Sequence, residues 1–81
     1  MNPPDQTVRL ERRDPARNMA RAYQVSLAID LFGTVLLVRQ WGRIGTRGQA
    51  LHAGFDTAEA ARAARDRLLA AKRRRGYCDR T

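Results

Sequence analysis

The sequence predicts an α+β domain in which an antiparallel sheet of four or five strands is covered on one face by a single C-terminal helix. Three observations lead to this fold class. Apolar and polar residues alternate with a period of two in much of residues 7–55. The links between the alternating segments are as short as hairpin turns. After Phe55 the pattern changes to that of a helix, so the helix follows the strands instead of alternating with them.

The first half of the chain predicts two strands. Residues 7–13 alternate apolar with charged side chains, as a half-buried strand does. Asp14 and Pro15 end this strand because proline lacks the backbone donor that a sheet needs, and residues 16–20 are predicted as a loop. A second strand is predicted over residues 23–29, in which one face is entirely apolar: Tyr23, Val25, Leu27 and Ile29.

Two further strands are predicted before the helix. Residues 30–34 contain the Asp and Gly of a hairpin turn, and residues 34–44 are rich in β-branched and aromatic side chains. Residues 45–48 include two glycines, which tolerate the positive φ of a tight turn. Residues 49–55 can then return antiparallel to the third strand.

Residues 58–74 predict the helix because they contain no Gly, Pro or β-branched residue. Asp56 and Glu59 have the spacing of a capping box at its start, and Gly76 is a suitable stop. A stripe of small or apolar side chains is predicted to face the sheet: Ala60, Ala61, Ala64, Leu68 and Ala71.

With 81 residues and 9.2 kDa, the chain has room for one domain. We expect this domain to span residues 7–77, with a flexible N-terminus at 1–6 and a tail at 78–81. Cys78 is the only cysteine, so neither an internal disulfide nor the spacing of a zinc site is present. The polar N-terminus and the lack of a long apolar run predict a cytoplasmic protein with no membrane partner.

The charge of the chain indicates a polyanionic partner. Sixteen Lys and Arg against eight Asp and Glu give a net charge of +8, and all but Lys72 of the basic residues are arginine. Guanidinium groups can bind phosphate through two hydrogen bonds. The thirteen alanines leave a second interpretation open, in which a biased codon supply enriches both Ala and Arg.

Alternation along the third strand yields the candidate binding face. It places Arg39, Trp41 and Arg43 on one face and directs the opposite row, Leu36, Val38 and Ile44, toward the helix. Trp41 is therefore expected to be at least partly exposed, because burying its row would remove two arginines from water. An exposed indole beside cations suits a sugar or base with its phosphates. A packing role for Trp41 remains the alternative.

The segment WGRIGTRGQ at residues 41–49 resembles the characteristic motif of the WGR domain. This domain is found within DNA-dependent poly(ADP-ribose) polymerases and as small bacterial proteins. Upstream, Asn18, Arg21 and Tyr23 resemble the family's N-x-x-[KR]-x-Y pattern. The resemblance extends over about residues 10–77 and includes Phe55, the predicted helix, and Lys72 through Gly76 and Tyr77.

The resemblance implies an antiparallel sheet with one packed helix, in agreement with the prediction from the residues. In the polymerases, the tryptophan of the motif packs on the sugar at a DNA end. By this resemblance, Trp41 would contact the terminal nucleotide, and Arg43 would contact phosphate or a protein partner. Asn18 and Arg21 would be further phosphate contacts. No ADP-ribosyltransferase domain or zinc finger accompanies the motif in this sequence.

Together these observations predict a nucleic-acid-binding module that recognises DNA ends or breaks through Trp41, Arg43, Arg39, Asn18 and Arg21. The alternative is a protein-protein interaction module without direct DNA contact. No nucleophile motif, phosphate-binding glycine loop or paired carboxylates beside a histidine appear in the sequence. We therefore expect no enzymatic activity, catalytic residue, metal, cofactor or small-molecule substrate.

Overall fold

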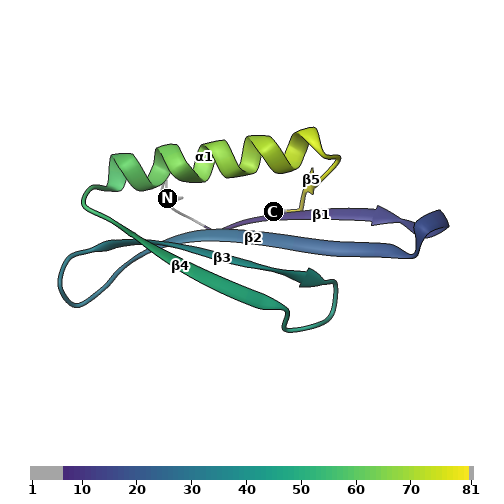
Figure 1. Cartoon of the computed structure of the whole chain (residues 1–81), viewed down its shortest axis with the longest axis horizontal. Coiled ribbons are helices and arrows are strands. Elements are labelled where there is room, and N and C mark those ends of the chain that lie inside the picture. Colours follow the sequence, from purple (N-terminus) through teal and green to yellow (C-terminus); the bar gives the residue numbers. More distant parts are fainter. Residues whose placement is uncertain (1–6, 81) are drawn as a thin grey trace.

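The computed structural model describes residues 7–80, which form one antiparallel sheet with an α-helix lying along one face (Figure 1). The strand order across the sheet is β4-β3-β2-β1-β5. The elements in chain order are β1 (Val8–Asp14), a short 3₁₀ helix (Pro15–Arg17), β2 (Met19–Ile29), β3 (Val35–Arg43), β4 (Gln49–Phe55), α1 (Ala58–Arg74) and β5 (Cys78–Asp79). The predicted α+β fold is confirmed.

The core lies between α1 and the middle of the sheet. The residues that are buried there and contact one another are Leu10, Tyr23, Val25, Leu37 and Leu69. The strands β1, β2 and β3 all contribute to this cluster. Their buried residues lie on the same side of the sheet, because directly paired residues of an antiparallel sheet face the same side. Phe55 and other apolar side chains surround the cluster and extend it toward the start of α1. Within residues 7–80, no helix is both long and apolar enough to span a membrane.

The face assigned to Trp41 from the sequence is wrong. Trp41 pairs with Tyr23 and Leu37 pairs with Leu27, so the row of Trp41 lies on the helix side of the sheet. Leu36 and Val38 lie on the opposite, uncovered face, and Ile44 follows the end of β3. The prediction assumed that the helix covers a whole row of β3.

In fact α1 covers only part of that row. Val35 and Leu37 are buried, whereas Arg39 and Trp41 are half-buried and Arg43 is exposed. The two arginines therefore remain in contact with water although they share a face with the core. The expectation that Trp41 is partly exposed agrees with the structure for this reason.

The predicted strand boundaries need two changes. Residues 16–20 were expected to form a loop, but β2 already begins at Met19, which pairs with Asp14. The connection is only the 3₁₀ turn and Asn18, which adopts a left-handed conformation with φ of 52°. Part of the expected tail, Cys78–Asp79, forms β5 against β1. The expected flexible N-terminus, residues 1–6, lies outside the described residues.

The cap and the buried stripe of α1 also differ from the prediction. The helix is capped by Thr57, whose hydroxyl oxygen accepts a 3.1 Å hydrogen bond from the Ala60 N–H, and not by Asp56. Ala61 and Leu69 are the buried helix residues, whereas Ala60 is exposed. Of the predicted stripe, Ala64 and Leu68 pack against the core as expected. Compared with the prediction, the helix is thus rotated about its axis so that Leu68 and Leu69 both face the sheet.

This rotation can be tested with two alanines that the sequence placed on the same stripe. Ala61→Leu is expected to lower the free energy of unfolding by about 1 to 3 kcal/mol, because position 61 is completely buried and has no room for three more carbons. Ala60→Leu should change it by less than about 0.5 kcal/mol, since that side chain is exposed. Urea denaturation of both variants measures the difference, and equal values would contradict the observed helix orientation.

Candidate nucleic-acid interface

The sheet continues past the C-terminal end of α1, and this leaves part of its helix-facing side uncovered. Figure 1 shows β1 and β2 extending well beyond the last turn of the helix. The uncovered surface forms a cavity of about 430 Å³. Its lining includes Arg17, Asn18, Met19, Arg21, Trp41, Gly42, Arg43, Lys72 and Tyr77.

Most of the site residues predicted from the sequence meet around this cavity. Trp41, Arg43, Asn18 and Arg21 all line it, although they come from β3, β2 and the turn before β2. The fifth, Arg39, lies on the other side of the indole, with its Cζ 5.9 Å from the ring centroid. At this distance the guanidinium has a favourable cation-π contact with Trp41.

Trp41 has both a packing role and an accessible surface. It is half-buried and packs against the core cluster that contains its cross-strand partner Tyr23. The same residue borders the 430 Å³ cavity and two neighbouring ones of about 210 and 410 Å³. The two interpretations of Trp41 from the sequence are therefore compatible, since one part of the residue stabilises the fold and another faces open space.

The strand that carries Trp41 is held by a close backbone contact between two glycines. A Cβ atom at Gly42 would lie 2.7 Å from the Gly48 Cα, and a Cβ at Gly48 would lie 2.1 Å from the Trp41 carbonyl oxygen. Both separations are shorter than real Cβ atoms tolerate. Gly48 also has a φ of +67°, which other residues adopt only with strain. The motif thus needs glycine at both positions so that the Trp41 backbone can pass close to the following turn.

Arg43 is fixed by the turn that precedes β2. Its Nη1 donates to the Asn18 backbone carbonyl at 3.1 Å, and its Nη2 donates to Asn18 Oδ1 at 3.3 Å. On the other side, the Arg43 carbonyl accepts hydrogen bonds from the backbone N–H and the hydroxyl of Thr46 at 3.0 and 2.7 Å. Two of the predicted site residues therefore form one hydrogen-bonded unit, and Arg43 holds Asn18 at the mouth of the cavity.

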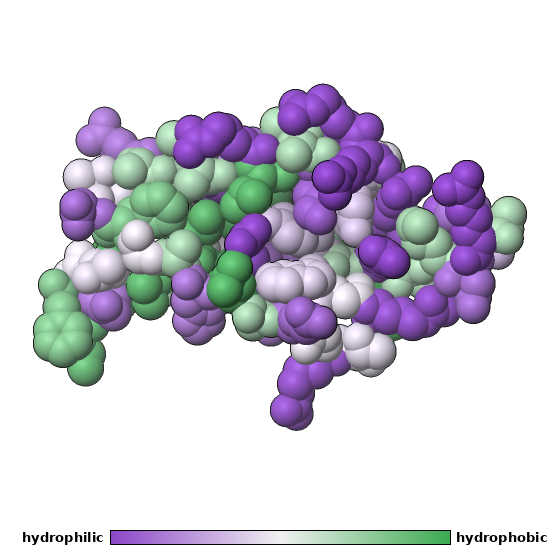
Figure 2. Space-filling view, in the orientation of Figure 1, coloured by the Kyte–Doolittle hydropathy of each residue, from purple (hydrophilic) through white to green (hydrophobic). Residues whose placement is uncertain are grey.

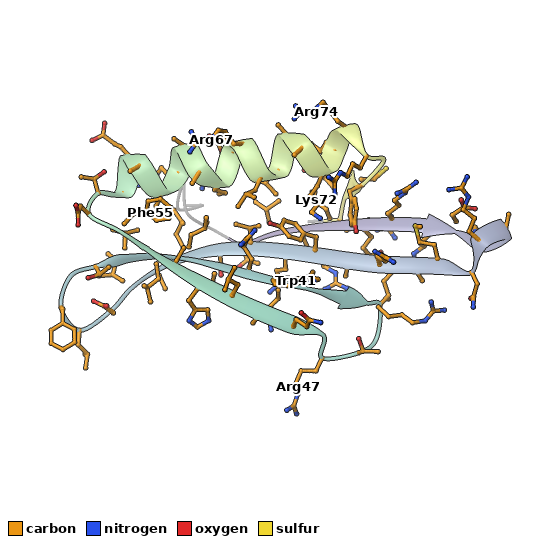
Figure 3. All side chains as sticks on the ribbon, in the orientation of Figure 1. Trp41, Arg47, Phe55, Arg67, Lys72 and Arg74 are labelled. Carbon is orange, nitrogen blue, oxygen red and sulfur yellow. The ribbon has the colours of Figure 1, made fainter. Side chains whose placement is uncertain are left out.

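Lys72 closes the cavity from the helix side. Figure 3 shows it descending from the last turns of α1 toward the sheet where Trp41 lies, while Arg74 points away. The Lys72 Nζ lies 4.8 Å from the centre of the Tyr23 ring and 5.3 Å from that of Tyr77. Burial lowers the pKa of Lys72, and the nearby charges of Arg75, Arg39 and Arg21 lower it further. An anion placed beside this ammonium would relieve the mutual repulsion of these cations.

Sequence reasoning did not include Arg17, Lys72 or Tyr77 among the site residues. From the sequence, the cations of residues 72–75 are expected to stabilise the negative end of the helix dipole, and a contact of this run with phosphate is left open as the alternative. The helical period contained a signal for its position, because Lys72 lies four residues after Leu68 and therefore on the sheet-facing side. No comparable pattern in the sequence indicates that Arg17 faces the cavity.

The electrostatic character of the cavity is uniformly positive within the described residues. Four cations, Arg17, Arg21, Arg43 and Lys72, line it, and no Asp or Glu does. The nearest described ion pair joins Arg17 to Asp14 at 3.6 Å on the exposed rim. The site is therefore suited to an anion.

The acidic side chains of Glu11 on β1 and Asp79 on β5 are already paired. Glu11 contacts Arg9, Arg13 and Arg80, and hydrogen bonds from Arg9 and Arg13 lower the pKa of its carboxyl group. Arg73 donates two hydrogen bonds to Asp79, at 2.8 and 2.7 Å, and thereby lowers the pKa of Asp79 and ties α1 to β5. These pairs hold the small strand β5 and engage neither Arg21, Arg43 nor Lys72 of the cavity.

The sequence that forms the site around Trp41, Gly42 and Arg43 belongs to a longer region of family similarity. The family model of the WGR domain matches residues 6–81, which is nearly the whole chain. The chain belongs to the WGR domain family. A protein of Sinorhizobium fredii (strain NBRC 101917 / NGR234), named "Uncharacterized protein y4dW", is 50% identical to it over 68 residues. That alignment covers 84% of this chain and 33% of the relative, so the chain spans about a third of that protein's length. No solved structure matches.

The WGR domain is a non-catalytic module that binds nucleic acid in poly(ADP-ribose) polymerases. The residues from which the WGR family takes its name occupy positions 41–43, and all three line the cavity. In the part of this WGR domain that the structure describes, no group of three His, Cys, Asp or Glu side chains is placed to hold a metal ion.

Proposed function

We propose that this WGR domain binds nucleic acid through the cavity beside Trp41 and that it prefers DNA ends or breaks. The observation that carries the proposal is the composition of the cavity, in which one half-buried indole stands among four cations and no described acid. Phosphates would contact the cations, and a terminal sugar or base would lie against the exposed part of Trp41.

The preference for ends rests on the shape of the surface and on the WGR relationship. Trp41 is enclosed on one side by the core, so only part of its ring is accessible. An internal nucleotide of a duplex is stacked on both sides and offers less surface to such a ring than a terminal one. Arg43 and Asn18 would contact the terminal phosphate. Arg21 on β2 and Arg39 on β3 would contact further phosphates.

Binding of a labelled linear duplex and of the same sequence as a closed circle, titrated at several salt concentrations, tests the proposal. With three to four phosphates neutralised, the logarithm of the association constant should fall with the logarithm of the salt concentration with a slope of roughly −3 to −4. The linear form should bind more tightly at every salt concentration. Equal binding of both forms would contradict end recognition. A slope near zero would favour the protein-protein interaction alternative.

Arg21→Ala and Arg74→Ala form a charge-matched pair for the same titration. Arg21 lines the cavity, so its loss should weaken binding and reduce the salt slope by about 1. Arg74 points away from the sheet in Figure 3, and its replacement should leave the slope nearly unchanged. Equal effects of the two substitutions would mean that the domain attracts nucleic acid only by its net charge.

A further inference from the structure

The turn between β2 and β3 presents two large apolar side chains to solvent at the end of the molecule opposite the cavity. Leu31 is 99% and Phe32 91% exposed, and Ile29 beside them is 73% exposed. Figure 2 shows the green atoms of this region projecting from the body of the domain. We call residues 30–34 the apolar turn. Neighbouring large apolar side chains that are this exposed are typical of an interaction site.

The conformation of the apolar turn is fixed before any partner arrives. Asp30 Oδ1 accepts hydrogen bonds from the N–H groups of Phe32 and Thr34 at 2.8 and 2.9 Å. The backbone of Asp30 is also bonded to Thr34 and to Gly33 at 3.0 and 3.1 Å. The two apolar side chains therefore stand on a closed turn, and little backbone entropy would be lost when they bind.

The surroundings of the apolar turn carry the opposite charge to the rest of the domain. The segments that form this end, residues 27–37 and 53–61, contain no Lys or Arg but contain Asp30, Asp56 and Glu59. They lie together because Val35 pairs with Phe55, directly before the start of α1. Acidic groups repel phosphate, so this end does not suit nucleic acid or an anionic lipid surface. It suits a protein surface that combines an apolar floor with basic residues.

A surface of that kind is present on the domain itself. A groove of about 410 Å³ runs between α1 and the edge strand β4. Leu51, Leu68 and Ala71 supply apolar surface, and Leu51 is 46% exposed. The cations of the groove are Arg39, Lys72 and Arg75. We call this surface the α1–β4 groove.

We infer that the apolar turn of one copy docks in the α1–β4 groove of a second copy of this chain. Leu31 and Phe32 would cover the apolar floor, and the acidic residues beside them would face Arg39, Lys72 and Arg75. The turn and the groove are different surfaces of the same chain, so the contact is heterologous and each copy can bind a neighbour on both sides. The small area of the turn makes the association weak. The α1–β4 groove shares Arg39, Trp41 and Lys72 with the proposed nucleic-acid site, so the two occupants would compete. The experiment uses the protein alone, so its outcome does not depend on whether the proposed nucleic-acid binding is correct.

Sedimentation equilibrium of the protein alone at about 0.15 M salt tests this inference, because the long-range repulsion between copies of net charge +8 is then largely screened. The weight-average mass should rise above 9.2 kDa with concentration. A double variant of the turn, Leu31→Ser with Phe32→Ser, and a groove variant, Leu51→Glu, should each stay at the monomer mass. His52→Glu, on the same strand but the opposite face, should associate like the unchanged protein.

The decisive sample is an equimolar mixture of the turn variant and the groove variant. One partner retains an intact groove and the other an intact turn, so the mixture should regain association, with a mass limited to two copies. Failure of the mixture to associate would overturn the inference, and so would a purely monomeric unchanged protein or association of either variant alone. Circular dichroism of every variant verifies that the fold is retained.

Discussion

Replacing Gly48 with alanine is expected to lower the free energy of unfolding by about 2 to 5 kcal/mol. About 1 to 2 kcal/mol comes from the positive φ, and the remainder from moving backbone atoms apart. The new Cβ would lie 2.1 Å from the Trp41 carbonyl oxygen and 3.2 Å from the Gly42 Cα. Because neither is a flexible side chain, the strand end itself must shift.

Gly45→Ala provides the matched control for this prediction. Gly45 has a φ of +88°, but a Cβ there would meet nothing within 4 Å. Gly45→Ala should therefore lower the free energy of unfolding only by the conformational cost of the positive φ, about 1 to 2 kcal/mol. For a domain of this size each kcal/mol lowers the melting temperature by about 4 to 8 °C, so thermal melts separate the two variants readily. Equal melting temperatures would mean that the glycine contact does not constrain the strand that carries Trp41.

Trp41→Ala is expected to weaken binding to DNA ends by about 1 to 3 kcal/mol, or roughly 5- to 150-fold, through the loss of aromatic stacking. It should also lower the free energy of unfolding by about 1 to 3 kcal/mol. This is less than a fully buried aromatic residue contributes, because Trp41 is only half-buried against the core. Fluorescence anisotropy with a labelled duplex end, recorded well below the melting temperature, measures the first effect, and thermal denaturation measures the second.

A stability-matched variant distinguishes the two effects of Trp41. Val35→Ala removes buried apolar surface from the same row of β3, but at the far end of the strand from the cavity. We expect it to lower the melting temperature while leaving end binding unchanged. Trp41→Phe should retain part of both functions. If Val35→Ala weakens end binding as much as Trp41→Ala does, the binding loss reflects general destabilisation and Trp41 is only a packing residue.

The sequence alone predicted the α+β class, the order of the four main strands and the bounds of α1, because these depend on local patterns. Alternation, turn glycines and the absence of helix breakers act over a few residues and can be recognised without knowing what packs where. Alternation likewise predicted that Arg39, Trp41 and Arg43 belong to one surface, since residues two apart on a strand share a face.

The structure alone decided which face that is. Alternation assigns residues to two rows but does not say which row a helix covers, or how far along the strand the cover extends. Here the row of Trp41 faces α1 and runs past its end, so Leu37 is buried and Arg43 on the same face is exposed. The rotation of α1 was missed for a related reason, because two adjacent leucines at 68 and 69 bury more apolar area than the stripe of alanines.

The candidate site shows the same division between local and long-range information. The sequence by itself determined the chemistry, namely an indole between arginines in a chain of net charge +8. Only the tertiary structure brought Asn18 within hydrogen-bonding distance of Arg43 and placed the Lys72 ammonium between two tyrosine rings. The contacts of Arg43 with Asn18 and of Lys72 with Tyr23 join residues 25 or more positions apart in sequence. Their distances depend on strand register and on where the helix stops, which no local pattern specifies.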